Sequence, residues 1–317
     1  MESVNDVAVK KGKKPRNSYR KASTGNMIFY CCLLAISLLQ FCVFYIGVNF
    51  NSIKLSFQGN YDFNTGRYEW VHFQNFKNFF AEWNSSAEFK VSIGNTLIGL
   101  AANLIVGVPL GVLFSYYIYK KRFCHNLFKI VLFMPSIISA VVIVGNFRYF
   151  VELAIPEIVK GITGSSIKGL LENADTRFGT IIFYNLWIGF GTPILMYVGA
   201  MNSIPESASE AAQIEGASLM QEFFHVTLPL AYPTIVTFVI ANIAGAFNNQ
   251  LNLYTFYGGN APSLIKTFGY IIYSRTQKAN YADYPYLACI GLLMTIIVVP
   301  VTLLTKWALE KFGPSTD

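Results

Sequence analysis

The polar side chains inside the apolar stretches of this 317-residue chain are mostly amides and hydroxyls. Amides donate and accept hydrogen bonds, and nearby aromatic rings offer flat faces for stacking. Together they suit a neutral, hydroxyl-rich molecule such as a sugar. The candidates for a binding cavity are Asn185, Trp187, Asn248, Asn249 and Gln250, with Arg148 as a cation nearby. The alternative is that each amide joins two helices, a bond worth roughly 0.6–2 kcal/mol, and for any single Asn this is the commoner role.

Residues for catalysis or metal binding are not grouped in this sequence. His72, His125 and His225 are scattered, and the five cysteines show no CxxC spacing. We therefore expect no catalytic residue and no metal site. The chain lacks the Walker A pattern of an ATPase, so it is not expected to be an enzyme that hydrolyses ATP.

Composition indicates an integral membrane protein. The chain is 53% hydrophobic and only 13% charged, whereas a soluble domain would carry about 25% charged residues. The net charge of +7 gathers in an N-terminal tail, which is typical of a cytoplasmic end at a lipid surface and not of a nucleic-acid partner. The tail cations are Lys10, Lys11, Lys13, Lys14, Arg16, Arg20 and Lys21.

Six segments are long and apolar enough to cross a membrane, which predicts an all-α fold with six transmembrane helices. They are 27–50, 91–119, 127–150, 178–200, 230–254 and 284–309. The basic tail and Lys120-Lys121-Arg122 place both termini in the cytoplasm. We therefore divide the chain into a basic tail (1–26), a first helix (27–50), an extracytoplasmic segment (51–90) and a core (91–310).

The spans hold almost no charged side chains, although a proton- or ion-coupled carrier usually keeps an ionisable group in mid-membrane. Energy for transport is therefore expected to enter outside the membrane. A membrane enzyme or a self-sufficient secondary carrier is the alternative from another class, and either would need a buried ionisable cluster.

The segment 51–90 contains aromatic residues at helical spacing, namely Phe76, Phe79, Phe80 and Trp83. This spacing predicts a helix lying on the membrane surface. Packing of the same residues against the helical bundle is an equally good interpretation.

The loop at 201–229 is predicted to lie in the cytoplasm, yet it has no Lys or Arg and carries four glutamates. Pro205 suits the first position of a helix that Ser203 or Asn202 could cap. Gly216 can end that helix in a left-handed conformation. A second helix is expected over 218–226, with Leu228-Pro229 ending it and starting the next membrane helix.

The loop sequence resembles the EAA loop of type-1 ABC-importer permeases. Glu210-Ala211-Ala212, Glu215, Gly216-Ala217, Phe224 and Leu228-Pro229 match that pattern, although the family more often has Asp where Glu215 stands. The segment Gly258-Gly259-Asn260-Ala261-Pro262 further resembles the carbohydrate-uptake group, which includes the maltose permeases.

The resemblance implies a type-1 permease fold in the bacterial cell membrane. It implies that Glu210, Ala211, Ala212, Glu215, Gly216 and Ala217 dock on an ATPase dimer, which would hold the ATP and magnesium that this chain lacks. A second permease, forming a heterodimer, and an extracytoplasmic solute-binding protein would complete an importer for an oligosaccharide. A glycerol-phosphate-like substrate is the alternative, and it would need cations in the cavity.

Overall fold

The computed structural model describes residues 24–314, which divide into two units after Asn51. The first unit is helical and its described side chains are exposed along its length, as in a helix surrounded by lipid. It contains α1 (Thr24–Gln40), the π-helical stretch η1 (Phe41–Gly47) and the start of α2 (Val48–Ser56). The predicted basic tail falls mostly on residues 1–23, outside the described part.

In the second unit, the end of α2 is followed by a small β-hairpin that an all-α prediction did not include. Strands β1 (Gln58–Asp62) and β2 (Arg67–Trp70) pair antiparallel, with Gln58 opposite Trp70. Gly66 at φ +65° supplies the left-handed turn that connects them. The amide of Asn75 then donates to the carbonyls of Ser56 (2.9 Å) and Gln58 (2.7 Å), which ties the hairpin to the following helix.

The aromatic helix predicted before the second span is α3 (Gln74–Ser85). Phe79 is 4% exposed and packs edge-to-face on Phe89, whereas Phe80 is exposed. Phe79 therefore packs against the bundle, and Phe80 is free to lie against a membrane or a partner.

Within the described residues, four helical runs are long and apolar enough to cross a membrane: Met27–Ser56, Ala87–Tyr119, Leu219–Tyr257 and Tyr284–Phe312. Two bent pairs raise the number of candidate spans to six if each pair counts as one. The pairs are His125–Ile137 with Ala140–Thr163, bent by 107°, and Ala174–Ile188 with Gly191–Asn202, bent by 41°.

The predicted third helix is wrong as a single segment. It breaks into α6 (His125–Ile137) and α7 (Ala140–Tyr149), which continues through η3 (Phe150–Ala154) to α8 (Ile155–Thr163). Pro135 removes a backbone donor just before the break, and Ile138 adopts an extended conformation there.

The predicted fourth helix is likewise two, α9 (Ala174–Ile188) and α10 (Gly191–Asn202). A Cβ at Gly191 would lie 2.6 Å from the Ser136 side chain, so only glycine permits this contact between α10 and α6.

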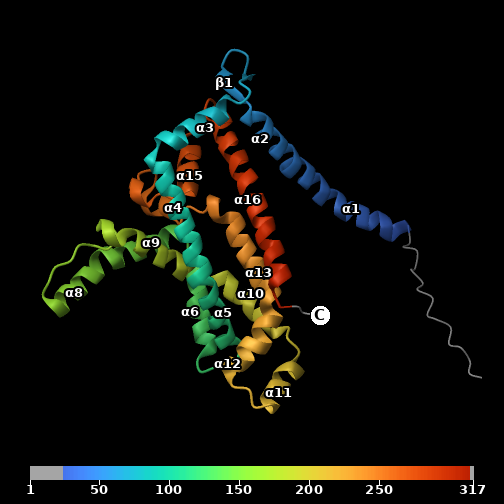
Figure 1. Ribbon diagram of the computed structural model, residues 1–317, viewed down its shortest axis with the longest axis vertical. Helices are drawn as coiled ribbons and strands as arrows, with labels where there is room; N and C mark the ends of the chain where they lie inside the picture. The colour runs from blue at the N-terminus through green and yellow to red at the C-terminus, as the bar shows by residue number, and fades with distance from the viewer. Residues whose placement is uncertain (1–23, 315–317) are drawn as a thin grey trace, which may run out of the picture. The chain divides into compact units, whose positions relative to one another are not determined.

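The remaining helices form the bundle of the second unit, with the hairpin at one end and α11 at the other (Figure 1). They are α4 (Ala87–Ala102), η2 (Asn103–Gly107), α5 (Val108–Tyr119), α13 (Leu228–Gly245), η5 (Ala246–Asn248), α14 (Leu253–Tyr257), η6 (Ser263–Ile265), α15 (Phe268–Lys278) and α16 (Tyr284–Phe312). One buried cluster joins α5, α10 and α13 through Val112, Tyr197 and Ile235.

An ion pair closes the hairpin end of the bundle. The carboxylate of Glu82 in α3 accepts two hydrogen bonds from the guanidinium of Arg275 in α15 and one from the hydroxyl of Tyr286. Partial burial raises the pKa of Glu82, but these hydrogen bonds and the charge of Arg275 outweigh it and lower the pKa below its ordinary 4.5.

Replacing Glu82 with Gln should lower the free energy of unfolding by about 1–2 kcal/mol near neutral pH, because one hydrogen-bonded charge pair is lost. Since the folded-state pKa is lowered, the carboxylate contributes fully above its ordinary pKa and loses that contribution as pH falls through the lowered value. Unfolding midpoints of wild type and variant should therefore converge only in acid. The exposed Glu157→Gln is the control, and a difference that persists unchanged to about pH 2 would contradict the assignment.

Candidate functional site

The loop at 201–229 forms two short helices that meet at a glycine. They are α11 (Glu206–Ile214) and α12 (Leu219–Glu222). Gly216 has φ +77°, its amide donates to the carbonyl of Gln213 (3.0 Å), and the amide of Ala217 donates to that of Ala212 (2.9 Å). The predicted left-handed elbow at Gly216 is confirmed.

Two details of the predicted loop are wrong. No side chain caps α11, because Pro205 precedes it in an extended conformation and Ser203 bonds its own preceding turn. Leu228-Pro229 does not end the second helix. The chain continues from α12 through the π-helical stretch η4 (Phe223–Thr227) into α13, and the wider turn of a π-helix accommodates a proline that lacks an N–H.

The six predicted docking residues divide between two faces of the loop. Glu210, Ala211, Glu215 and Gly216 are exposed, Ala217 is half-buried, and Ala212 is buried against the chain itself. Ile214 was not singled out from the sequence, yet it lies one turn after Glu210 and is 86% exposed. An apolar side chain so exposed beside a carboxylate is typical of a protein contact.

A buried ion pair anchors this loop to the bundle. Nζ of Lys120, the residue after α5, contacts Oε1 of Glu222 and donates to Oγ of Ser209 (3.0 Å). Ser209 in turn donates to Glu222 (2.6 Å), which is 2% exposed. The hydroxyl of Tyr116 also donates to the carbonyl of Leu219 (2.9 Å). Three helices are therefore joined at one point.

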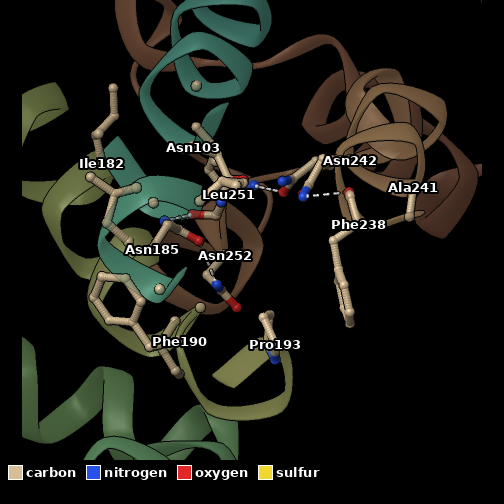
Figure 2. A pocket seen from close by; sticks show the side chains of 18 of the residues that line it. Asn103, Ile182, Asn185, Phe190, Pro193, Phe238, Ala241, Asn242, Leu251 and Asn252 are labelled. Carbon is tan, nitrogen blue, oxygen red and sulfur yellow. Dashed lines mark hydrogen bonds between the residues drawn. The ribbon is translucent and has the colours of Figure 1, made fainter. Parts of the chain in front are cut away.

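A cavity of about 430 Å³ lies between α9, α10, α13 and the η2–α5 segment (Figure 2). None of the described residues that line it is charged; its lining is amide, glycine, aliphatic and aromatic. The amides are Asn103, Asn185, Asn242, Asn249 and Asn252.

An unwound segment of four residues, 249–252, forms one wall of this cavity. The Asn185 amide group donates to the carbonyl of Leu251 (2.9 Å), and its oxygen accepts from the amide of Asn252 (2.8 Å) (Figure 2). Leu251 and Asn252 both have positive φ, so the chain reverses direction here. Asn185 thus holds the segment 249–252 in place, and Asn185 itself also lines the cavity.

Two polar atoms at the cavity have no hydrogen-bond partner within the described chain, Oη of Tyr197 and Oδ1 of Asn103. Tyr197 is 1% exposed, and its ring packs edge-to-face on Phe238, which also lines the cavity. A buried polar atom without a partner costs about 1–3 kcal/mol. Both atoms have almost no accessible surface, so a ligand or water in the cavity reaches them only after the side chains around them move.

Residues 107–317 match the family described as the inner membrane component of binding-protein-dependent transport systems. The match covers two thirds of the chain and includes both the loop and most of the cavity. The chain belongs to this permease family. The prediction that it is a transport subunit and not an enzyme is therefore confirmed.

Curated relatives of this permease are bacterial transport proteins. It is 28% identical over 224 residues to the arabinooligosaccharides transport system permease AraP of Bacillus subtilis, covering 68% of this chain and 70% of that protein. It is also 28% identical over 284 residues to the multiple sugar-binding transport system permease MsmF of Streptococcus mutans, covering 88% and 94%.

A solved structure shares the fold. A chain of a bacterial ABC transporter involved in the import of the acidic polysaccharide alginate superposes with a TM-score of 0.74 at 19% identity, over 91% of this permease and 96% of that chain. The predicted helical permease fold is confirmed, apart from the β1–β2 hairpin.

The structure brings only part of the predicted cavity set together. Asn185 and Asn249 line the cavity, whereas Asn248 faces a separate apolar pocket beside α16. Trp187 lies outside the cavity, where it stacks on Phe147 in a buried cluster. The other two predicted cavity residues also lie outside it.

Those two are Arg148 and Gln250, neither of which lines the cavity. Arg148 pairs with Glu152 (2.9 Å), one turn further along the same helical run. Gln250 has a buried side-chain oxygen that meets no hydrogen-bond partner among the described residues.

Tyr197, Asn103, Lys120 and Glu222 were missed as site residues. Lys120 was read only as an orientation signal, and the acidic character of the loop, noted for the whole segment, could have singled out Glu222 as its partner. Tyr197 could not be identified from the sequence, because only the folded structure shows that its hydroxyl is buried without a hydrogen-bond partner.

Replacing Glu222 with Gln should lower the free energy of unfolding by roughly 3–5 kcal/mol, because Lys120 would be left buried without a counter-charge. The double variant Lys120→Met with Glu222→Leu should recover much of that loss, since no buried charge remains. Thermal unfolding of the purified permease measures both effects, with the exposed Glu206→Gln as control. Equal losses in the single and double variants would contradict the pairing.

Proposed function

We propose that this permease is one subunit of an ATP-driven bacterial ABC importer, and that its cavity carries a neutral oligosaccharide across the cytoplasmic membrane. A second permease, in a heterodimer, would supply the other half of the pathway. An extracytoplasmic solute-binding protein would deliver the sugar. Six spans with both termini in the cytoplasm would put the loop at 201–229 on the ATPase side.

The charge-free, amide-lined cavity is the observation that carries the substrate class. Amides and a phenol can exchange hydrogen bonds with sugar hydroxyls without the desolvation cost of a buried charge. The names of the curated relatives, for arabinooligosaccharides and multiple sugars, support the same class. A glycerol-phosphate-like anion would need cations, and Arg148 is engaged with Glu152 away from the cavity.

Coupling to an ATPase dimer is assigned to the exposed side of the loop. Glu210 would pair with a cation of the ATPase, and Ile214 would enter an apolar cleft one turn away. Glu215, Gly216 and Ala211 would lie along the contact, while Ala212 and Ala217 allow α11 to sit close to its own bundle. ATP and magnesium would bind to the ATPase and not to this chain.

Replacing Glu210 with Gln or Ile214 with Ser should each weaken ATPase binding by about tenfold, because truncating a central interface residue costs on the order of 1–2 kcal/mol. Copurification of the ATPase with the tagged permease measures this effect. The control is Glu157→Gln in α8, an exposed carboxylate outside the loop at 201–229. The ATPase should copurify with this variant as it does with the wild type. Wild-type copurification of both loop variants would count against the docking assignment.

Replacing Tyr197 with Phe should reduce sugar uptake by about three- to tenfold while the ATPase still copurifies, because one hydrogen bond of roughly 1 kcal/mol to the substrate is lost. Tyr184→Phe is a matched control: its hydroxyl is also buried and unpartnered, but it lies in a packed cluster outside the cavity. Equal uptake by the two variants for every oligosaccharide tried would reject the cavity as the sugar path.

A further inference from the structure

An apolar groove of about 740 Å³ runs along the end of α5, the start of α6 and the first turn of α12. Its walls are formed by Leu113, Phe114, Leu127, Phe128, Val131 and Met220. Phe128 packs edge-to-face on Phe114 (5.4 Å) and Tyr117 (5.3 Å), which fixes the floor. The volume lies in the range of small-molecule sites, and the walls of Leu127, Val131 and Met220 remain exposed in this chain.

Cations lie at one end of this groove. Lys120 and Arg122 are both part of its lining, and Lys121 lies between them in the connection from α5 to α6. Lys120 is neutralised by Glu222. Within residues 24–314, neither Lys121 nor Arg122 lies within ion-pair distance of a carboxylate, and both side chains are exposed. The mouth of the groove therefore carries net positive charge.

The connection that presents these cations is ordered by its own hydrogen bonds. The hydroxyl of Tyr117 donates to the carbonyl of Phe123 (2.7 Å), and Lys121 and Cys124 adopt left-handed backbone conformations on either side of Arg122. The groove mouth is thus formed by the folded chain and does not depend on a ligand.

The cations of the groove follow directly on an apolar span. The candidate span Ala87–Tyr119 ends one residue before Lys120, and basic residues directly after a span are typical of the headgroup layer. Leu113 lies six residues inside that end, about 9 Å deeper along the helix. A ligand that fits this arrangement has an anionic head and an apolar tail.

We propose that this groove binds one anionic phospholipid, with its phosphate at Lys121 and Arg122 and an acyl chain along Leu113, Leu127 and Val131. Each exposed cation near the headgroup layer is worth roughly 1 kcal/mol towards anionic lipid, which corresponds to about fivefold in affinity. The bound lipid would lie directly beside Met220 and the Lys120–Glu222 pair, so it would brace the same connection that anchors the loop. This site is separate from the sugar cavity and does not require the proposed substrate.

Photolabelling tests this site. The purified full-length permease, with its copurifying subunits, is reconstituted with phosphatidylglycerol that carries a diazirine in its acyl chain, or with phosphatidylcholine of the same chain. After irradiation, peptides are mapped by mass spectrometry. Phosphatidylglycerol should label residues 113–131 at least several-fold more than phosphatidylcholine, because only its headgroup is anionic.

Two variants separate the headgroup from the chain. Lys121→Gln with Arg122→Gln should lower phosphatidylglycerol labelling by roughly 10- to 30-fold, whereas Lys306→Gln with Lys311→Gln removes the same charge from the end of α16 and should leave it unchanged. Val131→Trp fills the groove and should reduce labelling while the cations remain. Equal labelling by the two lipids, or wild-type labelling of the Lys121/Arg122 variant, would overturn the proposal. Absence of phosphatidylglycerol labelling at residues 113–131 in the assembled complex would also overturn it, because a protein would then occupy the groove.

Discussion

The position of the loop at 201–229 depends on the buried pair between Lys120 and Glu222. Charges taken out of water are costly unless they are paired and hydrogen-bonded, and here Ser209 supplies the additional bond. The pair joins the end of α5 to both short helices of the loop. The buried side chains of α11 are Ser209 and Ala212. Without the pair, the loop would keep the Tyr116–Leu219 hydrogen bond, but α11 would lose its charged contact with the end of α5.

The same arrangement explains how a docked ATPase could act on the membrane core. No helix break separates α12 from α13, because the π-helical stretch carries the chain past Pro229. A displacement of the loop would therefore pass directly into α13, whose far end unwinds at 249–252 beside the cavity. Asn185 holds that segment from α9, and Gly269 allows α15 to approach it, since a Cβ there would lie 2.7 Å from the backbone of Asn248 and Asn249.

The positions of the helices were predicted from the sequence more accurately than the breaks within them. Hydropathy placed the last helix at 284–309 against the observed Tyr284–Phe312, and Gly216 was identified as the elbow because few other residues adopt φ near +77°. The break at Ile138 was not predicted, because the residues around it are apolar enough to read as continuous helix. The unwinding after Asn248 was not predicted either, because Asn249, Gln250 and Asn252 were read as one polar cluster on a continuous fifth helix. Tertiary contacts decide them, such as that of Gly191 with Ser136.

The cavity shows the same limit. Amide type and position predicted Asn185 and Asn249, but periodicity on a continuous helix could not exclude Asn248, which the 3-10 turn directs elsewhere. Tyr197 belongs to a buried cluster, and nothing in its local sequence distinguishes it from a packing residue. Arg148 was named as a cavity candidate because it is the cation near the outer end of the predicted third helix. Its pairing with Glu152, beyond the predicted end of that span, was not considered.

The central claim is that the buried pair makes the loop a rigid link between ATP hydrolysis and the sugar cavity. The most direct test is the number of sugar molecules imported per ATP hydrolysed by the reconstituted transporter, compared between wild type and Glu222→Gln. The account predicts that the variant still hydrolyses ATP when its ATPase is bound, but imports several-fold less sugar per ATP. An unchanged ratio, with the loop pair removed and the transporter assembled, would contradict it.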